Sequence, residues 1–210
     1  CVSISDNNGN LLFYAATMPY SGSNPAFSTI VFNSTNSIMA NGDSIFGKGW
    51  YQELVIVPNP ANDSTYYLFS IGSTTTFGLC YSIIDMRLNN GLGAVTVKNI
   101  QLQSFQQVDC LNAVKHGNGR ELYDFDRCSG LLSNLVTIEP EALPSVPYLF
   151  SCAFSPDASK LYVSTADQPT WLFQYDLNAS NITLSKDTLW TISSPQYAGG
   201  GLKLAPDNKI

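Results

Sequence analysis

The stretch FSPDASKLYVST, residues 154–165, decides the fold, because a related stretch follows fifty residues later as LKLAPDNKI, residues 202–210. Two landmarks recur with a separation of 50 residues: Pro156-Asp157 as Pro206-Asp207, and Phe125-Asp126 as Tyr175-Asp176. Proline presets φ at the second position of a turn and aspartate favours the next position, so each Pro-Asp pair predicts a turn that opens a strand. A repeated turn and strand at this spacing indicates a chain built from similar units.

Strand signals run through the rest of the chain. Seven stretches are rich in β-branched and aromatic residues and are bounded by turn formers. They are LLFYAA (11–16), ELVIVP (53–58), TYYLFSI (65–71), GLCYSII (78–84), AVTVKNIQL (94–102), KLYVST (160–165) and TWLFQYDL (170–177). No stretch shows the sustained apolar spacing of an amphipathic helix with caps. The sequence therefore predicts an all-β protein of short antiparallel strands.

A period of about 40–50 residues in an all-β chain is typical of a β-propeller, in which each blade is a sheet of four antiparallel strands. A blade has an apolar face that it can bury only against its neighbours. We therefore expect residues 1–210 to form a single β-propeller domain. Because a lone edge strand exposes unpaired backbone groups, we also expect the last blade to continue beyond residue 210.

Composition restricts the classes of function. The chain of 210 residues carries a net charge of −6, and only 12% of its residues are charged, so a basic nucleic-acid-binding face is not expected. No apolar run approaches the ~18 residues of a membrane span. Asn and Ser supply much of the polar surface, which favours an extracellular or cell-surface location.

The five cysteines form no Cys-x-x-Cys pair and His116 is the only histidine, so a zinc site is not expected and no metal or cofactor is predicted. Cys128 and Cys152 flank one candidate unit. A disulfide between them would close a loop of roughly 24 residues and contribute ~3 kcal/mol. The alternative is a pair of buried thiols.

A longer resemblance adds to these patterns. CVSISDNNGNLLFYA, IMANGDSIFG, ELVIVPNPANDSTYYLFSI, GLCYSIIDMRLNNGLGAVTVKN, LNAVKHGNGR, ELYDFDRCSGLLSN and FSPDASKLYVSTADQPTWLFQYDLN occur in this order. Together they resemble a largely uncharacterised family of Bacteroidetes secreted and cell-surface proteins with a β-propeller-like region. The resemblance implies a cargo of the type IX secretion system, often adhesin-like or linked to gliding motility. Its implied partners are components of the secretion translocon and cell-surface proteins or glycans.

The resemblance also predicts a gap in the repeat. In relatives the counterpart of AVKHGNGR (113–120) leads into a further blade section, whereas here Arg120 runs directly into Glu121. Either part of a blade has been lost, or a segment between residues 120 and 121 is unobserved. By analogy the whole propeller has about seven blades, of which 210 residues at this period supply about four.

Aromatic residues are the first candidate ligand contacts. Trp50, Tyr51 and Trp171 could form a platform for a sugar ring, since their side chains combine a flat apolar face with a polar tip. The alternative is packing, because Trp171 alternates with Phe173 and Tyr175 along one strand.

Polar candidates are each weighed against a simpler explanation. His116, near Lys115 and Arg120, could act as a general base, but it is better explained as a loop residue. Asp6, Asn8 and Asn10 superficially resemble a calcium loop, yet the Asn-Gly pair predicts a hairpin turn. Asp157 and Asp207 are interpreted as turn residues. Glu139 and Glu141 could pair for glycoside chemistry, but their neighbouring prolines favour an exposed loop.

These observations lead to one expected function and one alternative. We expect a non-enzymatic propeller module of a secreted or surface-anchored bacterial protein, which displays loops for adhesion, surface attachment or protein interaction. The alternative is a carbohydrate-binding propeller, or a polysaccharide-active hydrolase or lyase.

Overall fold

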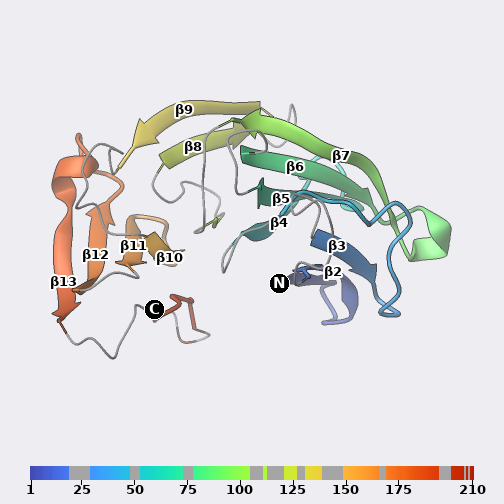
Figure 1. The fold of residues 1–210 in the computed structure, drawn as a ribbon, viewed down its shortest axis with the longest axis horizontal. Coiled ribbons are helices and arrows are strands. Elements are labelled where there is room, and N and C mark those ends of the chain that lie inside the picture. The colour runs from blue at the N-terminus through green and yellow to red at the C-terminus, as the bar shows by residue number, and fades with distance from the viewer. Residues whose placement is uncertain are drawn as a thin grey trace. The chain divides into compact units, whose positions relative to one another are not determined.

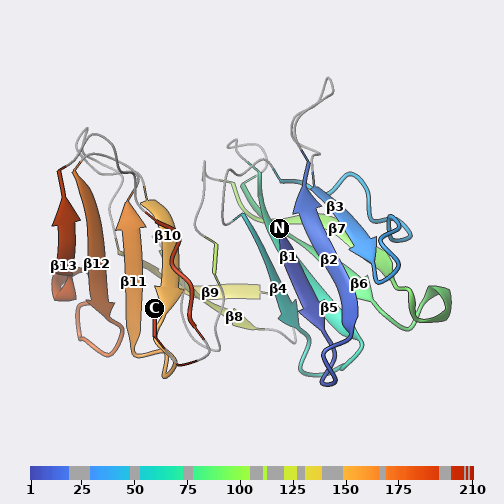
Figure 2. The same ribbon diagram turned by 90° about the horizontal axis from the view of Figure 1, so that it is seen from below.

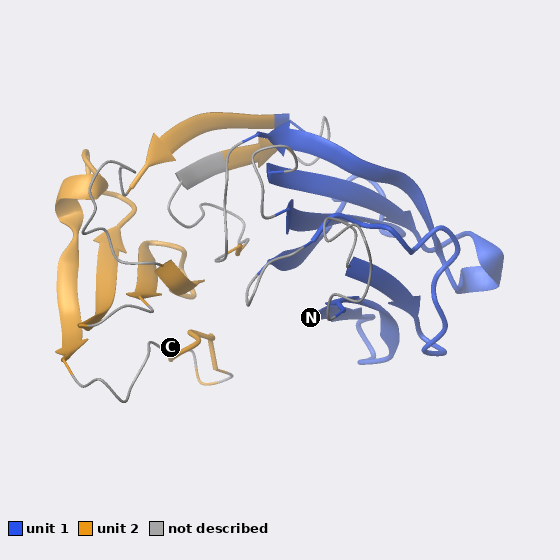
Figure 3. Cartoon of the chain, viewed as in Figure 1, with its two compact units in different colours: residues 1–108, 127–131 blue, residues 109–126, 132–210 orange. Residues whose placement is uncertain are grey.

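The computed structural model describes most of the chain and divides it into two compact units. The described residues are 1–18, 29–47, 53–72, 78–104, 111–112, 121–126, 131–138, 149–165, 169–193, 200–205, 207 and 209–210. One unit comprises residues 1–108 and 127–131, and the other comprises residues 109–126 and 132–210 (Figure 3). Throughout these residues the regular structure is strand, apart from two single-turn 3-10 helices (Figure 1). None of the described helices is long or apolar enough to cross a membrane.

The first unit contains seven strands in two antiparallel sheets. These strands are β1 (Val2–Ser5), β2 (Leu11–Thr17), β3 (Thr29–Asn33), β4 (Leu54–Pro58), β5 (Thr65–Gly72), β6 (Gly78–Asp85) and β7 (Ala94–Gln103), with a 3-10 turn η1 (Asn89–Gly91) before β7. One sheet has the order β1-β2-β3 and the other the order β4-β5-β6-β7. Every strand therefore pairs with its neighbour in the chain, as in a meander (Figure 2).

An irregular segment completes the first sheet. Residues 37–47 follow the free edge of β3 through isolated bridges, and Met39 N donates to the Val31 carbonyl oxygen at 2.9 Å. Asn41 and Ser44 have positive φ, so the segment cannot continue as a regular strand. The first sheet is thus a meander of three strands and one broken edge segment, which matches the four-stranded plan of its neighbour.

The two sheets of this unit pack so that strands at equivalent positions in each sheet contact each other. First strands meet, because β1 contacts β4. Second strands meet where the rings of Phe13 and Tyr66 pack edge to face with centroids 5.4 Å apart. Fourth positions meet where Val95 N donates to the Ala40 carbonyl oxygen at 2.9 Å. The shared core lies between the sheets and includes Phe13, Ala15, Val31, Met39, Ile45, Leu54, Tyr66, Leu68, Ile84 and Val95.

The second unit repeats the four-stranded plan. Its strands are β8 (Glu121–Asp126), β9 (Leu131–Thr137), β10 (Leu149–Phe154), β11 (Lys160–Thr165), β12 (Thr170–Asp176) and β13 (Asp187–Ile192), with a 3-10 turn η2 (Thr183–Ser185) before β13. β10-β11-β12-β13 form one antiparallel sheet, and β8-β9 form a two-stranded sheet. The core of this unit contains Ile138, Cys152, Phe154, Leu161, Val163, Phe173 and Tyr175. The prediction of an all-β chain with short antiparallel strands is confirmed.

Asparagine and aspartate residues close the strands of each sheet. At the end of a third strand, the side-chain oxygen of Asn33, Asp85 or Asp176 accepts the backbone N–H two residues later at 2.9–3.0 Å. At the turn into a second strand, Asp6 and Asp157 accept the corresponding N–H at 2.9 and 3.1 Å. Such Asx turns replace a backbone hydrogen bond where the chain reverses. The predicted turn at residues 6–10 is confirmed.

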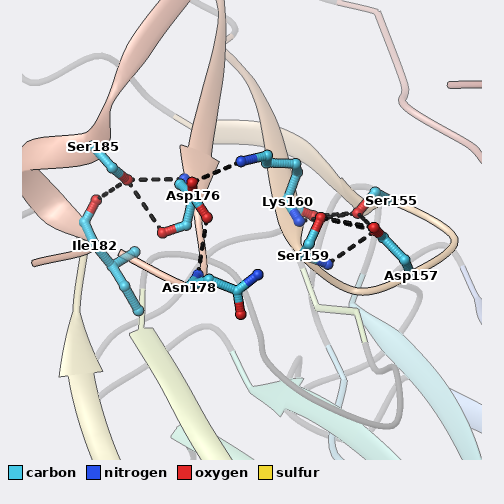
Figure 4. A network of polar contacts seen from close by, with 8 residues as sticks. All are labelled: Ser155, Asp157, Ser159, Lys160, Asp176, Asn178, Ile182 and Ser185. Atoms are coloured by element: carbon cyan, nitrogen blue, oxygen red, sulfur yellow. Dashed lines mark hydrogen bonds and ion pairs between the residues drawn. The ribbon is translucent and has the colours of Figure 1, made fainter. Parts of the chain in front are cut away.

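Figure 4 shows the network around the Pro156-Asp157 corner. The Ser155 hydroxyl donates to Asp157 Oδ1 at 2.6 Å, and the Ser159 hydroxyl donates to the same oxygen at 2.9 Å. Asp207, fifty residues after Asp157, forms the same kind of turn, because Lys209 N donates to Asp207 Oδ1 at 3.3 Å. Asp157 and Asp207 are therefore turn residues, as predicted. The hydrogen bonds from Ser155 and then from Ser159 lower the pKa of Asp157 from 3.8 to about 2.

Acid is expected to weaken this corner over a defined pH range. Because the folded pKa of Asp157 lies below its usual value, the carboxylate stabilises the folded chain at pH above about 4, and this contribution is lost as pH falls toward 2. In Asp157→Asn the amide oxygen can still accept the Ser159 N–H, but the group does not titrate. Denaturant midpoints measured from pH 5 to 2 should converge for the wild type and Asp157→Asn as acid is added. A constant difference between them would contradict the assignment.

Candidate functional site

The aromatic candidates from the sequence fall into two groups. Trp171 lies on β12, half-buried, and its ring stacks on that of Phe173 with centroids 6.1 Å apart and an interplanar angle of 14°. It also packs against the core of the second unit. Trp50 and Tyr51 lie outside the described residues. The sugar platform therefore stays a prediction, and part of the Trp171 ring serves packing.

Most of the other candidates also lie outside the described residues. This applies to Cys128, His116, Lys115, Arg120, Glu139 and Glu141. Cys152 is buried on β10, and its carbonyl oxygen accepts a hydrogen bond from Asn112 Nδ2 at 3.0 Å. The Cys128–Cys152 disulfide therefore stays a prediction.

The structure identifies a polar cluster in the first unit that the sequence patterns did not reveal. Glu53 immediately precedes β4 and is 4% exposed. Its Oε1 accepts a hydrogen bond of 2.6 Å from the hydroxyl of Thr17, at the end of β2. The Thr17 hydroxyl oxygen lies 3.0 Å from that of Thr29, at the start of β3. We call these three residues the Glu53 cluster. It joins the two sheets of the unit at one end of their shared core.

Each neighbouring element helps to place the cluster. Thr17 and Thr29 face each other across the β2–β3 ladder, so their hydroxyl groups lie on the same face of the sheet. The Glu53 carbonyl oxygen accepts the Ile71 N–H at 3.1 Å, which holds the start of β4 against β5. Gly47 passes so close that a Cβ there would overlap the Thr29 hydroxyl oxygen. The backbone therefore leaves room for the polar groups and for nothing larger at that point.

Among the described residues, two buried polar atoms near this end have no hydrogen-bond partner. They are Glu53 Oε2 and Ser70 Oγ. Ser70 lies opposite Leu54 in the β4–β5 ladder, one rung from Glu53, and is fully buried. A buried polar atom without a partner costs about 1–3 kcal/mol, so such atoms in a native fold call for an explanation. A carboxyl oxygen without a partner can accept one further hydrogen bond.

Basic side chains in the described residues are largely engaged by aspartates. Ion pairs join Arg87 to Asp85, Lys98 to Asp43, Lys160 to Asp176 and Lys209 to Asp207, with N–O distances of 2.6–3.1 Å. Lys186 lies over the ring of Phe173 at 3.9 Å from its centroid. The described part of the chain therefore shows no cluster of unpaired cations that would select a phosphate or carboxylate group.

Comparison with known proteins supports the fold alone. No protein-family model matches the sequence, and no curated protein matches it. Among solved structures, the chain is similar to a candidate 6-phosphogluconolactonase from Bacteroides uniformis, with a TM-score of 0.54 and 13% sequence identity. The match covers 94% of this chain and 59% of that structure, so the chain spans about three fifths of the length of the protein it resembles.

This similarity corrects one expectation from the sequence. We expected a non-enzymatic module because no nucleophile motif accompanies His116. The fold is instead shared with a protein described as a candidate enzyme, which contradicts that expectation. The absence of a local motif did not exclude an enzyme, because catalytic groups that converge from different strands leave no such motif in the sequence.

Proposed function

We propose that the chain forms consecutive blades of a single β-propeller domain that binds and hydrolyses a neutral sugar lactone or related sugar ester. The observation that carries this proposal is the fold similarity to a candidate 6-phosphogluconolactonase over 94% of the chain. Two observations support the propeller architecture. The sheets share a meander topology, and in the first unit the strands at equivalent positions of the two sheets pack against each other. Secretion by the type IX system and display at the cell surface, where the protein could contact other proteins or glycans, stay part of this proposal on the family resemblance.

A neutral substrate is preferred on electrostatic grounds. The chain has a net charge of −6. Most of the Lys and Arg side chains in the described residues form ion pairs with aspartates. An anionic 6-phospho sugar needs Arg or Lys groups that hold its phosphate. A neutral sugar needs hydrogen-bond donors and acceptors together with apolar faces, and this chain is rich in both.

Hydrolysis of a lactone has a simple readout. Water adds to the ring carbonyl carbon, the bond between that carbon and the ring oxygen breaks, and the resulting aldonic acid releases a proton. We expect the purified protein to accelerate proton release from D-glucono-1,5-lactone at least about tenfold over buffer at the same pH, and to act less well on the 6-phosphorylated lactone. Heat-denatured protein is the control. A folded protein that leaves both lactones at their spontaneous rates would exclude the proposed reaction.

A further inference from the structure

Asparagine followed by glycine is a reactive pair, because glycine has no Cβ to shield its backbone nitrogen from the neighbouring side chain. The chain has four such pairs, which begin at Asn8, Asn41, Asn90 and Asn118. Asn118 lies outside the described residues. The other three pairs lie at turns or edges of the first unit, and the contacts around them differ enough to separate a pair that can react from pairs that are held.

Loss of the asparagine amide, or deamidation, needs only water as a co-reactant. The glycine nitrogen gives up its proton to a base in the solvent and attacks Cγ of the asparagine. An N–Cγ bond forms, the Cγ–Nδ2 bond breaks and ammonia leaves. Water then opens the succinimide ring to aspartate or isoaspartate, which adds a negative charge. A glycine N–H or an asparagine side chain that is hydrogen-bonded must first be freed by local opening of the chain.

The Asn41 pair is held at the atoms that this reaction uses. Asn41 Nδ2 donates to the Val95 carbonyl oxygen at 2.8 Å. The buried Gly42 donates its N–H to the Met39 carbonyl oxygen, also at 2.8 Å. A Cβ at Gly42 would lie 2.7 Å from the Val31 carbonyl oxygen, so the backbone has little room to move. Freeing this pair requires residues 37–47 to leave both β3 and β7.

The Asn8 pair lies in an exposed turn that Asp6 closes. The Gly9 N–H donates to the Asp6 carbonyl oxygen at 3.0 Å. Asp6 Oδ1 accepts the backbone N–H groups of Asn8 and Asn10 at 2.9 and 2.8 Å. Water reaches this turn, but several hydrogen bonds must break together before Gly9 can approach the Asn8 side chain.

The Asn90 pair is the least restrained of the three. Asn90 and Gly91 are exposed and lie in the single-turn helix η1 between β6 and β7. The Gly91 N–H donates to the Leu88 carbonyl oxygen at 3.2 Å, and the same oxygen also accepts the Gly93 N–H at 3.0 Å. Nothing lies within 4 Å of a Cβ placed on Gly91, so the backbone has space to turn. A short 3-10 turn with a shared acceptor opens at low free energy.

We propose that Asn90 is a deamidation site of the folded protein and that the fold protects Asn41. This inference is independent of the proposed function. Modification of Asn90 places a negative charge on the exposed loop between β6 and β7. Modification of Asn41 would instead remove the amide that donates to Val95 and joins the two sheets of the first unit.

The test follows the whole protein over time in mildly alkaline buffer, once folded and once in concentrated urea. Samples are quenched in acid and digested with trypsin, which releases Asn90 in the peptide 88–98, apart from the other three pairs. Mass spectrometry with fragmentation locates each converted asparagine and separates Asn8 from Asn41. Asn90→Asp serves as the control, because it has no amide to lose at this position and aspartate tolerates a positive φ.

We expect Asn90 to be converted at least about tenfold faster than Asn41 in the folded protein, with Asn8 between them. In urea the three rates should become comparable. Conversion of Asn41 as fast as that of Asn90 in the folded protein would overturn the inference, as would an Asn90 that reacts only in urea. The same order and spread of rates in urea would assign the difference to flanking residues and would also overturn it.

Discussion

Replacing Phe13 with alanine is expected to lower the free energy of unfolding by about 3–5 kcal/mol, one of the largest losses available in this chain. Phe13 is fully buried on β2 and packs edge to face on Tyr66 of β5. The variant loses both the transfer free energy of the ring and the contacts around the cavity that remains. Because the ring lies between the two sheets, no surface residue can move in to fill the space.

Urea unfolding followed by fluorescence gives the measurement for Phe13→Ala. Leu184→Ala is the matched control, because Leu184 is 81% exposed and its truncation should change stability by less than about 0.5 kcal/mol. Equal losses in the two variants would mean that the sheets of the first unit do not share a core around Phe13.

Gly78→Ala should cost about 2–5 kcal/mol, because two separate penalties add at this position. Gly78 opens β6 with φ of +50°, a conformation in which a Cβ crowds its own backbone. An added Cβ would also overlap the Gln103 carbonyl oxygen and lie 2.9 Å from the Gln103 carbonyl carbon, at the end of β7. Backbone atoms cannot rotate away, so the β6–β7 ladder would have to shift.

Gly91→Ala separates the two penalties. Gly91 has φ of +86°, and nothing lies within 4 Å of an added Cβ there. This variant therefore carries the conformational penalty alone, about 1 kcal/mol. The difference between the two variants in thermal or urea unfolding measures the overlap with Gln103. If Gly91→Ala proved as damaging as Gly78→Ala, the close approach of β6 and β7 at this point would be wrong.

Much of the fold could be predicted from local pattern. LLFYAA, TYYLFSI and KLYVST alternate or run apolar between turn formers, and β2, β5 and β11 follow them closely. The Pro-Asp landmark also holds, because Asp157 and Asp207 each accept the backbone N–H two residues later in their turns. Local propensity and tertiary packing agree at these places, so the sequence alone is informative.

Other elements lack a local signal. β13 is largely exposed, with Leu189 and Trp190 among its exposed side chains, and its sequence shows no apolar alternation that would separate it from a loop. Residues 37–47 contain Asn-Gly-Asp-Ser, which indicates a turn, although tertiary hydrogen bonds hold the segment beside β3. The Asx turn that ends the third strand of a sheet occurs at both Asn33 and Asp85. The sequence does not reveal this repeat, because the residue changes from Asn to Asp and the spacing is 52 residues. Such positions are defined by contacts with distant residues.

The Glu53 cluster could not be found from the sequence for a similar reason. Thr17 and Glu53 are 36 residues apart, and Glu53 looks like a polar residue that bounds the apolar strand LVIVP. One signal was present, namely a single acidic residue placed directly against a strand with strong apolar character. Only the packing of one sheet on the other brings its carboxyl group to Thr17 and Thr29.

The broken segment at residues 37–47 has a consequence for how readily the chain associates with other copies of itself. A regular outer strand would offer a straight row of amide and carbonyl groups on which another molecule could add. Here positive φ at Asn36, Asn41 and Ser44 interrupts that row, and Ala40, Ser44 and Phe46 direct backbone groups to β7 instead. The rim of the first sheet is therefore a poor template for self-association, and straightening it would favour aggregates.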